Sequence, residues 1–167
     1  MPAKATLRHI SLEIADAQRS RVFYDRFLPP LGFRRFAAEP EYLGYTDGTM
    51  TVWLLRSHAP RIRRRPPTGE EEVIAEHIAF HLPSASSVRS IEAALLRQEL
   101  YPFFRGEVHP EFRPGYFSAT WLDPDGVALE LYAIGEGRSA RRPATARRKP
   151  HRATRPARAA RRRRGAR

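Results

Sequence analysis

The sequence predicts an α+β fold in which two tandem βαβββ modules form a cupped mixed β-sheet. The first observation behind this prediction is an internal repeat, since residues 76–82 resemble residues 8–14 at an offset of 68 residues. The second is a mirrored turn, Asp47-Gly48 in the first half and Asp125-Gly126 in the second. A duplication of this kind constrains architecture more strongly than any single motif.

The first half is expected to contain one strand, one helix and three further strands. Alternating residues predict the first strand over 7–14. Asp16 is a suitable N-cap for a helix over 17–28, and Pro29-Pro30 ends that helix. The remaining strands are predicted over about 31–37, 41–45 and 49–55.

The second half repeats this order. A strand over 76–82 is followed by a helix over about 86–100, which has apolar residues at helical spacing. The strands that follow are predicted at 103–104, 116–122 and 127–134. The second half is therefore again β-α-β-β-β.

Two segments are predicted to lie outside the modules, which gives a domain over 1–137 with module one at 7–56 and module two at 74–135. Residues 57–73 are rich in Pro and Arg and then acidic, as in a surface linker. Residues 138–167 contain 14 Arg or Lys and no acid, so the net charge of +12 belongs to this tail. The tail lacks large apolar residues and is expected to be disordered. It could bind polyanions such as nucleic acid without specificity, or such binding could be incidental.

The composition limits the compartment and the metal ligands. Cysteine is absent, so a metal would have to use His, Asp or Glu. We find neither a secretory signal nor an apolar run of the roughly 18 residues that a membrane span needs. The default expectation is a cytoplasmic protein without membrane contact.

Glu130 is the residue that points to chemistry. It follows the turn Asp123-Pro124-Asp125-Gly126 and lies between Leu129 and Leu131 in an apolar strand. A lone buried carboxylate costs several kcal/mol unless it is compensated. A cation, a hydrogen-bond network or a metal could compensate it.

His9 and His77 occupy equivalent points of the two duplicated first strands. If these strands meet near a pseudo-twofold axis, both imidazoles face one cavity together with Glu130. Two imidazoles and one carboxylate bind a divalent metal and leave positions open for substrate. The alternatives are hydrogen-bonded core histidines and a Glu130 that pairs with a nearby Arg or Tyr.

The chain resembles the vicinal oxygen chelate superfamily, which contains glyoxalases, bleomycin-resistance proteins, extradiol dioxygenases and fosfomycin-resistance enzymes. The resemblance covers about residues 7–134. The segments that carry it are His9-Ile10-Ser11-Leu12, Phe23-Tyr24 through Leu31-Gly32-Phe33, His77-Ile78-Ala79-Phe80, Pro114-Gly115-Tyr116-Phe117, and Asp123-Pro124-Asp125-Gly126 through Glu130.

This resemblance implies a glyoxalase/dioxygenase-like fold, a homodimer, and a divalent metal held by His9, His77 and Glu130. A fourth ligand, usual in metal-dependent glyoxalases, would fall at Val52, four residues after Gly48, with Thr51 and Trp53 beside it, and none of these three is a good ligand. The metal would be Fe, Mn, Ni, Co or Zn.

Other polar residues are candidates for the same site. Glu13 and His81 share the inward parity of the two histidines and could act as catalytic acid or base, or lie at the rim in an ion pair. Tyr116 and Ser118, with Thr120, could line the cavity, while Phe117 and Trp121 take the other face, or the strand could pack in the core instead. His109 and Arg113 lie in a preceding loop and could contact substrate, or be solvated.

The sequence thus predicts an enzyme that chelates two adjacent oxygens of a small substrate through a divalent metal. The reaction is implied by the resemblance alone, and it could be lyase, isomerase, thiol-transfer or dioxygenase chemistry. A metal-free protein that binds a small molecule such as an antibiotic is the alternative. Nucleic-acid association through the tail is a second alternative.

Overall fold

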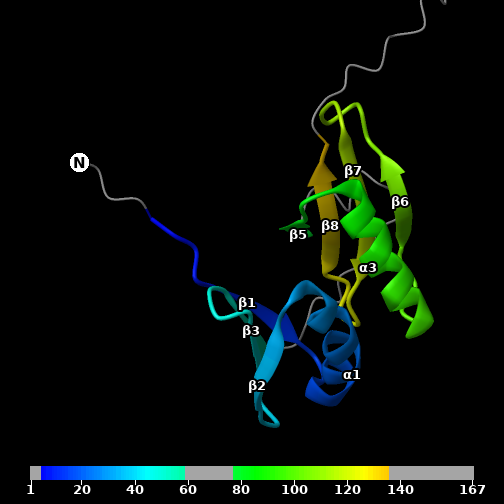
Figure 1. The fold of residues 1–167 in the computed structure, drawn as a ribbon. Coiled ribbons are helices and arrows are strands. Elements are labelled where there is room, and N and C mark those ends of the chain that lie inside the picture. Colours follow the sequence, from blue (N-terminus) through cyan, green and yellow to red (C-terminus); the bar gives the residue numbers. More distant parts are fainter. Residues whose placement is uncertain (1–4, 59–76, 136–167) are drawn as a thin grey trace, which may run out of the picture.

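The computed structural model describes residues 5–58 and 77–135, and these form two βαβββ modules (Figure 1). Module one contains β1 (His9–Ile14), α1 (Ala17–Phe27), the short 3-10 helix η1 (Pro29–Leu31), β2 (Arg34–Ala38), β3 (Tyr42–Thr46) and β4 (Thr51–Arg56). Module two contains β5 (His77–His81), α3 (Ala85–Arg97), β6 (Phe104–Val108), β7 (Tyr116–Leu122) and β8 (Ala128–Ile134).

Each module forms its own four-stranded mixed sheet. The strand orders are β1-β4-β3-β2 and β5-β8-β7-β6, and in each sheet only the pairing of the first strand with the last is parallel. The predicted fold class and module order are therefore confirmed. The strand β6 extends to Val108, beyond the predicted 103–104. Its residues Arg105, Gly106 and Glu107 do not show the apolar pattern of a strand, because β6 lies at the edge of the sheet and its register shifts there.

The two main helices begin at side-chain caps. The Asp16 carboxylate accepts a hydrogen bond from the backbone N–H of Arg19 at 2.8 Å, as the sequence predicted for an N-cap. Ser84 caps α3 in the same way through the N–H of Ser87. The caps fix where each helix leaves its first strand.

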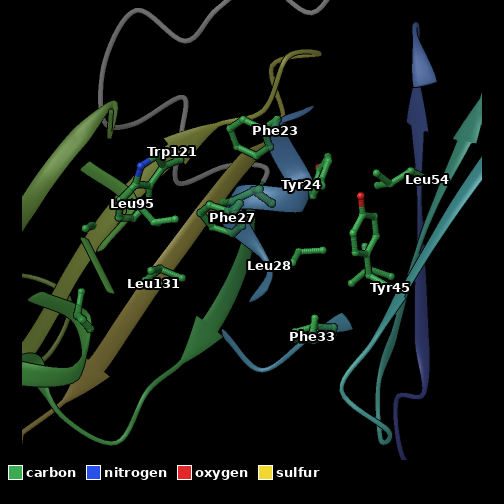
Figure 2. Close-up of a cluster of buried hydrophobic side chains, with 14 of the residues drawn as sticks. Phe23, Tyr24, Phe27, Leu28, Phe33, Tyr45, Leu54, Leu95, Trp121 and Leu131 are labelled. Atoms are coloured by element: carbon green, nitrogen blue, oxygen red, sulfur yellow. The ribbon is translucent and has the colours of Figure 1, made fainter. Parts of the chain in front are cut away.

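Helix α1 packs between the two sheets (Figure 2). On one side the Tyr24 ring lies 6.2 Å from that of Tyr45 in β3. On the other side the Phe27 ring lies 5.7 Å from that of Trp121 in β7 and 6.2 Å from that of Phe80 in β5. The core therefore joins the modules through a helix rather than through their first strands.

Polar contacts reinforce this junction at the turn between β7 and β8. The Tyr24 hydroxyl donates to a buried Asp123 oxygen at 2.8 Å. Asp125 accepts from the backbone N–H of Ala15 at 3.1 Å and pairs with Arg19 at 2.8 Å. Burial raises the pKa of Asp123, and the hydrogen bond from Tyr24 opposes that rise. The Asp-Pro-Asp-Gly turn thus also attaches module two to α1.

Several sequence predictions lie outside the described residues. These are most of the linker at 57–73, the tail at 138–167 and the exact domain boundaries. In the described part of the chain, no helix has the length and apolar character needed to cross a membrane.

Candidate functional site

Each sheet has an inner face that packs on the helices and an outer face turned away from α1. In module two the inner face includes Trp121 and Phe117, whose ring is contacted by Arg89 of α3. The strand register shows which residues form the outer face of module two. They are His77, Ala79, His81, Tyr116, Ser118, Thr120, Glu130 and Tyr132. The predicted alternation of Tyr116, Ser118 and Thr120 against Phe117 and Trp121 is confirmed.

Glu130 lies at the centre of this outer face and is only 7% exposed. Its Oε1 accepts a hydrogen bond from the Tyr116 hydroxyl at 3.0 Å. Its Oε2 lies 3.1 Å from Nε2 of His77, within ion-pair distance. Among the described residues, however, Oε2 is a buried side-chain oxygen that accepts no hydrogen bond. One carboxylate oxygen is therefore satisfied, and the other faces an imidazole.

Tyr116 is held in place by a stack of aromatic rings. Its ring stacks on Tyr132 at 5.3 Å, with 12° between the planes. Burial, followed by the nearby Glu130 charge, raises the pKa of Tyr116 well above its usual value, so the phenol keeps its proton and donates. Tyr132 was not among the sequence candidates, although its spacing of two residues from Glu130 gives it the same parity.

The candidates in the loop before β7 divide into one ordered and one solvent-facing residue. His109 stacks on Phe112 at 5.4 Å, and its Nδ1 lies 3.0 Å from the Glu111 carboxylate. Its ring lies 6.5 Å from that of Tyr116, so the loop adjoins the site. Arg113 is exposed in the same loop.

The remaining candidates of module two lie on the same outer face as Glu130. The His81 ring is 5.1 Å from the Tyr132 ring, against which Tyr116 also stacks. Ser118 is 5% exposed and pairs with Tyr132 across the strands. Both residues therefore border the Glu130 region, and their roles stay predictions.

In module one, His9 and Glu13 lie on the outer face of β1 and both are exposed. Their register partners on β4 are Thr51 and Leu55. Strand register extends this outer face across the sheet through Ser11, Trp53, Gly44, Tyr42 and Thr46.

The predicted position of a fourth ligand is wrong by one residue. Glu130 pairs with Ala79, two residues after His77, and the equivalent residue opposite Ser11 is Trp53. Val52 instead is buried on the inner face, opposite Ile10. The cause is the first Asp-Gly turn, which is followed by one more residue before its strand begins than the second turn is.

The structure brings His77 and Glu130 together but leaves His9 on the other sheet. Both outer faces are turned away from α1, which packs between the sheets (Figure 2). Within the described residues of one chain, no group of three His, Asp or Glu side chains could hold a metal. The set of His9, His77 and Glu130 therefore stays a prediction that a single chain does not assemble.

Comparison with known structures places the fold in a class. The chain has the fold of glyoxalase/bleomycin resistance/dioxygenase proteins, as the sequence resemblance predicted. No family model matches the sequence.

Three solved structures illustrate this likeness. A glyoxalase/bleomycin resistance protein/dioxygenase from Nocardioides is 16% identical, with a TM-score of 0.61 over 82% of this chain and 88% of that one. Lactoylglutathione lyase from Agrobacterium tumefaciens is also 16% identical, with a TM-score of 0.57 over 79% and 96%. A glyoxalase-related enzyme from Fulvimarina pelagi is 17% identical, with a TM-score of 0.56 over 77% and 87%.

A curated relative covers a similar part of the chain. The uncharacterized protein YqjT of Bacillus subtilis is 24% identical over 134 residues, which span 76% of this chain and 98% of that protein. The likeness extends over nearly the whole of that relative, and its name carries no activity.

Proposed function

We propose that the protein is a metal-dependent enzyme of the vicinal oxygen chelate type that acts on a small substrate as a homodimer. In this proposal each site takes His77 and Glu130 from one chain and His9 from the second chain. The observation that carries it is the buried Glu130 Oε2, which lacks a hydrogen bond and lies 3.1 Å from His77 Nε2. A buried carboxylate oxygen of this kind needs compensation.

The residues present fit a divalent cation. Neighbouring ligand atoms on such a metal lie about 3 Å apart, which is close to the separation of Glu130 Oε2 from His77 Nε2. Imidazole and carboxylate together suit Fe, Mn, Ni, Co or Zn. The third predicted ligand, His9, is exposed on an outer face and is accessible to another copy of the chain.

A second copy supplies what one chain cannot. The two outer faces of a chain point away from α1, so His9 cannot approach His77 of its own chain without breaking the contact of Phe27 with Trp121. In a two-fold dimer, the outer face of module one covers that of module two of the partner. A two-fold operation repeats this contact and creates two equal sites.

The side chains around the metal would then orient its ligands and transfer protons. A bound metal supplies a Lewis acid for two adjacent oxygens of the substrate. Tyr116 holds Glu130 Oε1 and leaves Oε2 directed toward His77. His81 and Glu13 are the candidates for moving a proton, His81 beside the aromatic stack and Glu13 on the covering face.

Metal content tests this function. Protein purified without chelators and dialysed against each of the five metals should retain about one equivalent per chain. His77→Ala and Glu130→Gln should each abolish retention. A matched control is His58→Ala, because His58 is an exposed histidine that pairs with Glu41 away from the site. Retention by the Glu130→Gln variant would contradict the proposal.

A second function is favoured by the same contact. His77 and Glu130 are close enough to form an ion pair that satisfies both groups without a metal. The chain would then be a metal-free binding protein for a small molecule such as an antibiotic. Absence of metal from the dialysed wild-type protein would support this alternative and exclude the enzyme proposed above.

A further inference from the structure

The Tyr116 ring, whose hydroxyl donates to Glu130, is packed against three other rings. Tyr132 of the next strand stacks on it at 5.3 Å, with 12° between the planes. Two rings from the loop between β6 and β7 meet it edge to face, Phe112 at 5.8 Å and 88° and His109 at 6.5 Å and 73°. The first of these neighbours is fixed in the sheet, whereas the other two depend on the conformation of the loop.

The backbone of this loop also closes on Tyr116. The N–H of His109 donates to the carbonyl oxygen of Tyr116 at 2.9 Å, and the N–H of Tyr116 donates to the carbonyl oxygen of Arg113 at 3.0 Å. The carbonyl oxygen of His109 accepts in turn from the N–H groups of Phe112 and Arg113, at 3.3 and 3.4 Å. His109 therefore closes the loop and contacts Tyr116 through both its backbone and its side chain.

The imidazole of His109 lies between two carboxylates. Its Nδ1 is 3.0 Å from Oε1 of Glu111, and its Nε2 is 4.0 Å from Oε1 of Glu107 in β6. The side chain of His109 is only 12% exposed. Because both ring nitrogens face carboxylates, His109 is suited to hold the loop in place.

The charge of His109 decides how firmly the loop is held. A protonated imidazole donates from both nitrogens, whereas a neutral imidazole has one N–H and presents a lone pair to the second carboxylate. A backbone hydrogen bond and, after it, the contact with His109 lower the pKa of Glu111, which favours its ionised form. Tyr116 keeps its proton, because burial raises the pKa of its phenol. The remaining charged group of the loop, Arg113, is exposed and makes no ion pair among the described residues.

We propose that His109 is a positioning residue: it holds Tyr116 so that the phenol hydroxyl keeps Glu130 in place, and it does so most firmly when it is protonated. This inference rests on the proposed function, because metal affinity reports the position of Glu130 as a ligand. Tyr116 contacts both residues, through its ring on His109 and through its hydroxyl at 3.0 Å from Glu130 Oε1. Loss of His109 should therefore weaken metal binding only while Tyr116 retains its hydroxyl.

Metal affinity in a set of four proteins tests this route. The wild type, His109→Phe, Tyr116→Phe and the double variant are each titrated with the metal that the wild type retains, in competition with a chromophoric chelator. His109→Phe keeps a ring against Phe112 and loses both carboxylate contacts, so it should weaken metal binding about three- to tenfold. In the Tyr116→Phe background the same substitution should change the affinity less than about twofold. Equal losses in both backgrounds, or no loss in either, would overturn the proposal.

A pH series distinguishes this role from packing alone. Protons compete with the metal for the ligands of every variant, so the informative quantity is the ratio of wild-type to His109→Phe affinity at each pH. This ratio should be largest near about pH 6 and approach one near about pH 8, as His109 loses its proton. The matched control is His58→Phe, because His58 is an exposed histidine that pairs with Glu41, and its ratio should stay close to one. A ratio for His109→Phe that is the same at every pH would contradict the proposal.

Metal-free protein separates this inference from the proposed function. In a pH titration followed by NMR of labelled tyrosine rings, one step in the Tyr116 resonances should coincide with the titration of His109 and be absent from His109→Phe. A second variant, His109→Gln, carries no charge and should also lack this step. Metal retention by a wild-type protein without the step would refute only the role of His109. The step in a wild-type protein that retains no metal would support that role and refute only the enzyme.

Discussion

At equivalent positions of β4 and β8, the outer face of module one carries Trp53 and the outer face of module two carries Glu130. Around Trp53 the neighbours are aromatic and exposed, whereas Glu130 is buried between His77 and Tyr116. The inner faces are alike, since both are apolar and pack on helices. The duplicated scaffold therefore fixes the packing of both halves and leaves their outer faces free to differ.

The two outer faces therefore differ in their chemistry. Module two brings together His77, Tyr116 and Glu130, to which the proposed function assigns a metal, whereas module one carries exposed aromatic side chains at the matching place. Substitutions on inner and outer faces, and in modules one and two, are therefore expected to have different effects.

The largest effect is expected from the two tryptophans. Trp121 is fully buried on the inner face, against Phe27. Trp121→Ala should reduce the free energy of unfolding by about 3–5 kcal/mol, because it leaves a large cavity. Trp53→Ala should reduce it by about 1 kcal/mol, because Trp53 packs on an outer face. Urea unfolding measures both, and equal losses would contradict the distinction between the faces.

Tyr116→Phe tests how module two holds its carboxylate. The substitution removes the hydrogen bond to Glu130 Oε1 and keeps the ring stack on Tyr132. Metal affinity should fall about 10- to 100-fold, as for other groups that orient a ligand. Competition with a chromophoric chelator measures this affinity. Tyr42→Phe, a matched change on the outer face of module one, should leave the affinity unaltered.

Alanine substitutions at Gly44 and Gly106 test whether the aromatic rings above each glycine can move aside. An added Cβ at Gly106 would come within 2.8 Å of Phe117, which is 2% exposed, and of the Glu92 carboxylate. Gly106→Ala should therefore cost about 2–3 kcal/mol in unfolding free energy. Gly44→Ala should cost only about 1 kcal/mol, because the half-exposed Phe36 can swing away. A larger cost at Gly44 would mean that Phe36 and Trp53 are packed as rigidly as a core.

The junction between the modules should respond to pH. Burial raises the pKa of Asp123 in the folded protein above its value in the unfolded chain, so the folded state binds the proton more tightly. Asp123 therefore contributes most stability below its unfolded pKa, and this contribution is lost as pH rises through the folded pKa.

Tyr24→Phe should extend that loss to higher pH. Its hydroxyl hydrogen bond lowers the pKa of Asp123, so its removal raises the folded pKa further. At neutral pH the variant should be less stable by about 1 kcal/mol. Urea unfolding across a pH series gives both quantities. A difference between variant and wild type that does not change with pH would show that Asp123 does not titrate at this junction.

Much of the fold was predictable because the repeat places His9 and His77 at equivalent strand positions, and because Asp16 caps a helix after the first strand. The contact of Glu130 with a tyrosine was among the sequence alternatives, and the structure identifies that tyrosine as Tyr116. The register between β7 and β8 places Tyr116 and Glu130 on the same face of the sheet.

What could not be predicted depends on contacts between the modules. Local patterns do not reveal that Phe27 packs on Trp121, although this contact turns the two outer faces apart and separates His9 from Glu130. The assignment of Val52 rather than Trp53 failed because one extra residue follows the first Asp-Gly turn. One inserted residue reverses the face of every side chain after it.

The central claim is a metal site shared between two chains. The most direct test is metal binding by a mixture of two variants that each bind no metal alone. His9→Ala and His77→Ala should each bind no metal alone. After both are unfolded and refolded together in equal amounts, half of the two-fold dimers should pair one chain of each kind and restore one of two sites. The mixture should then hold about one quarter of the wild-type metal per chain. Metal-free mixtures, or full retention by His9→Ala alone, would contradict a site shared between two chains.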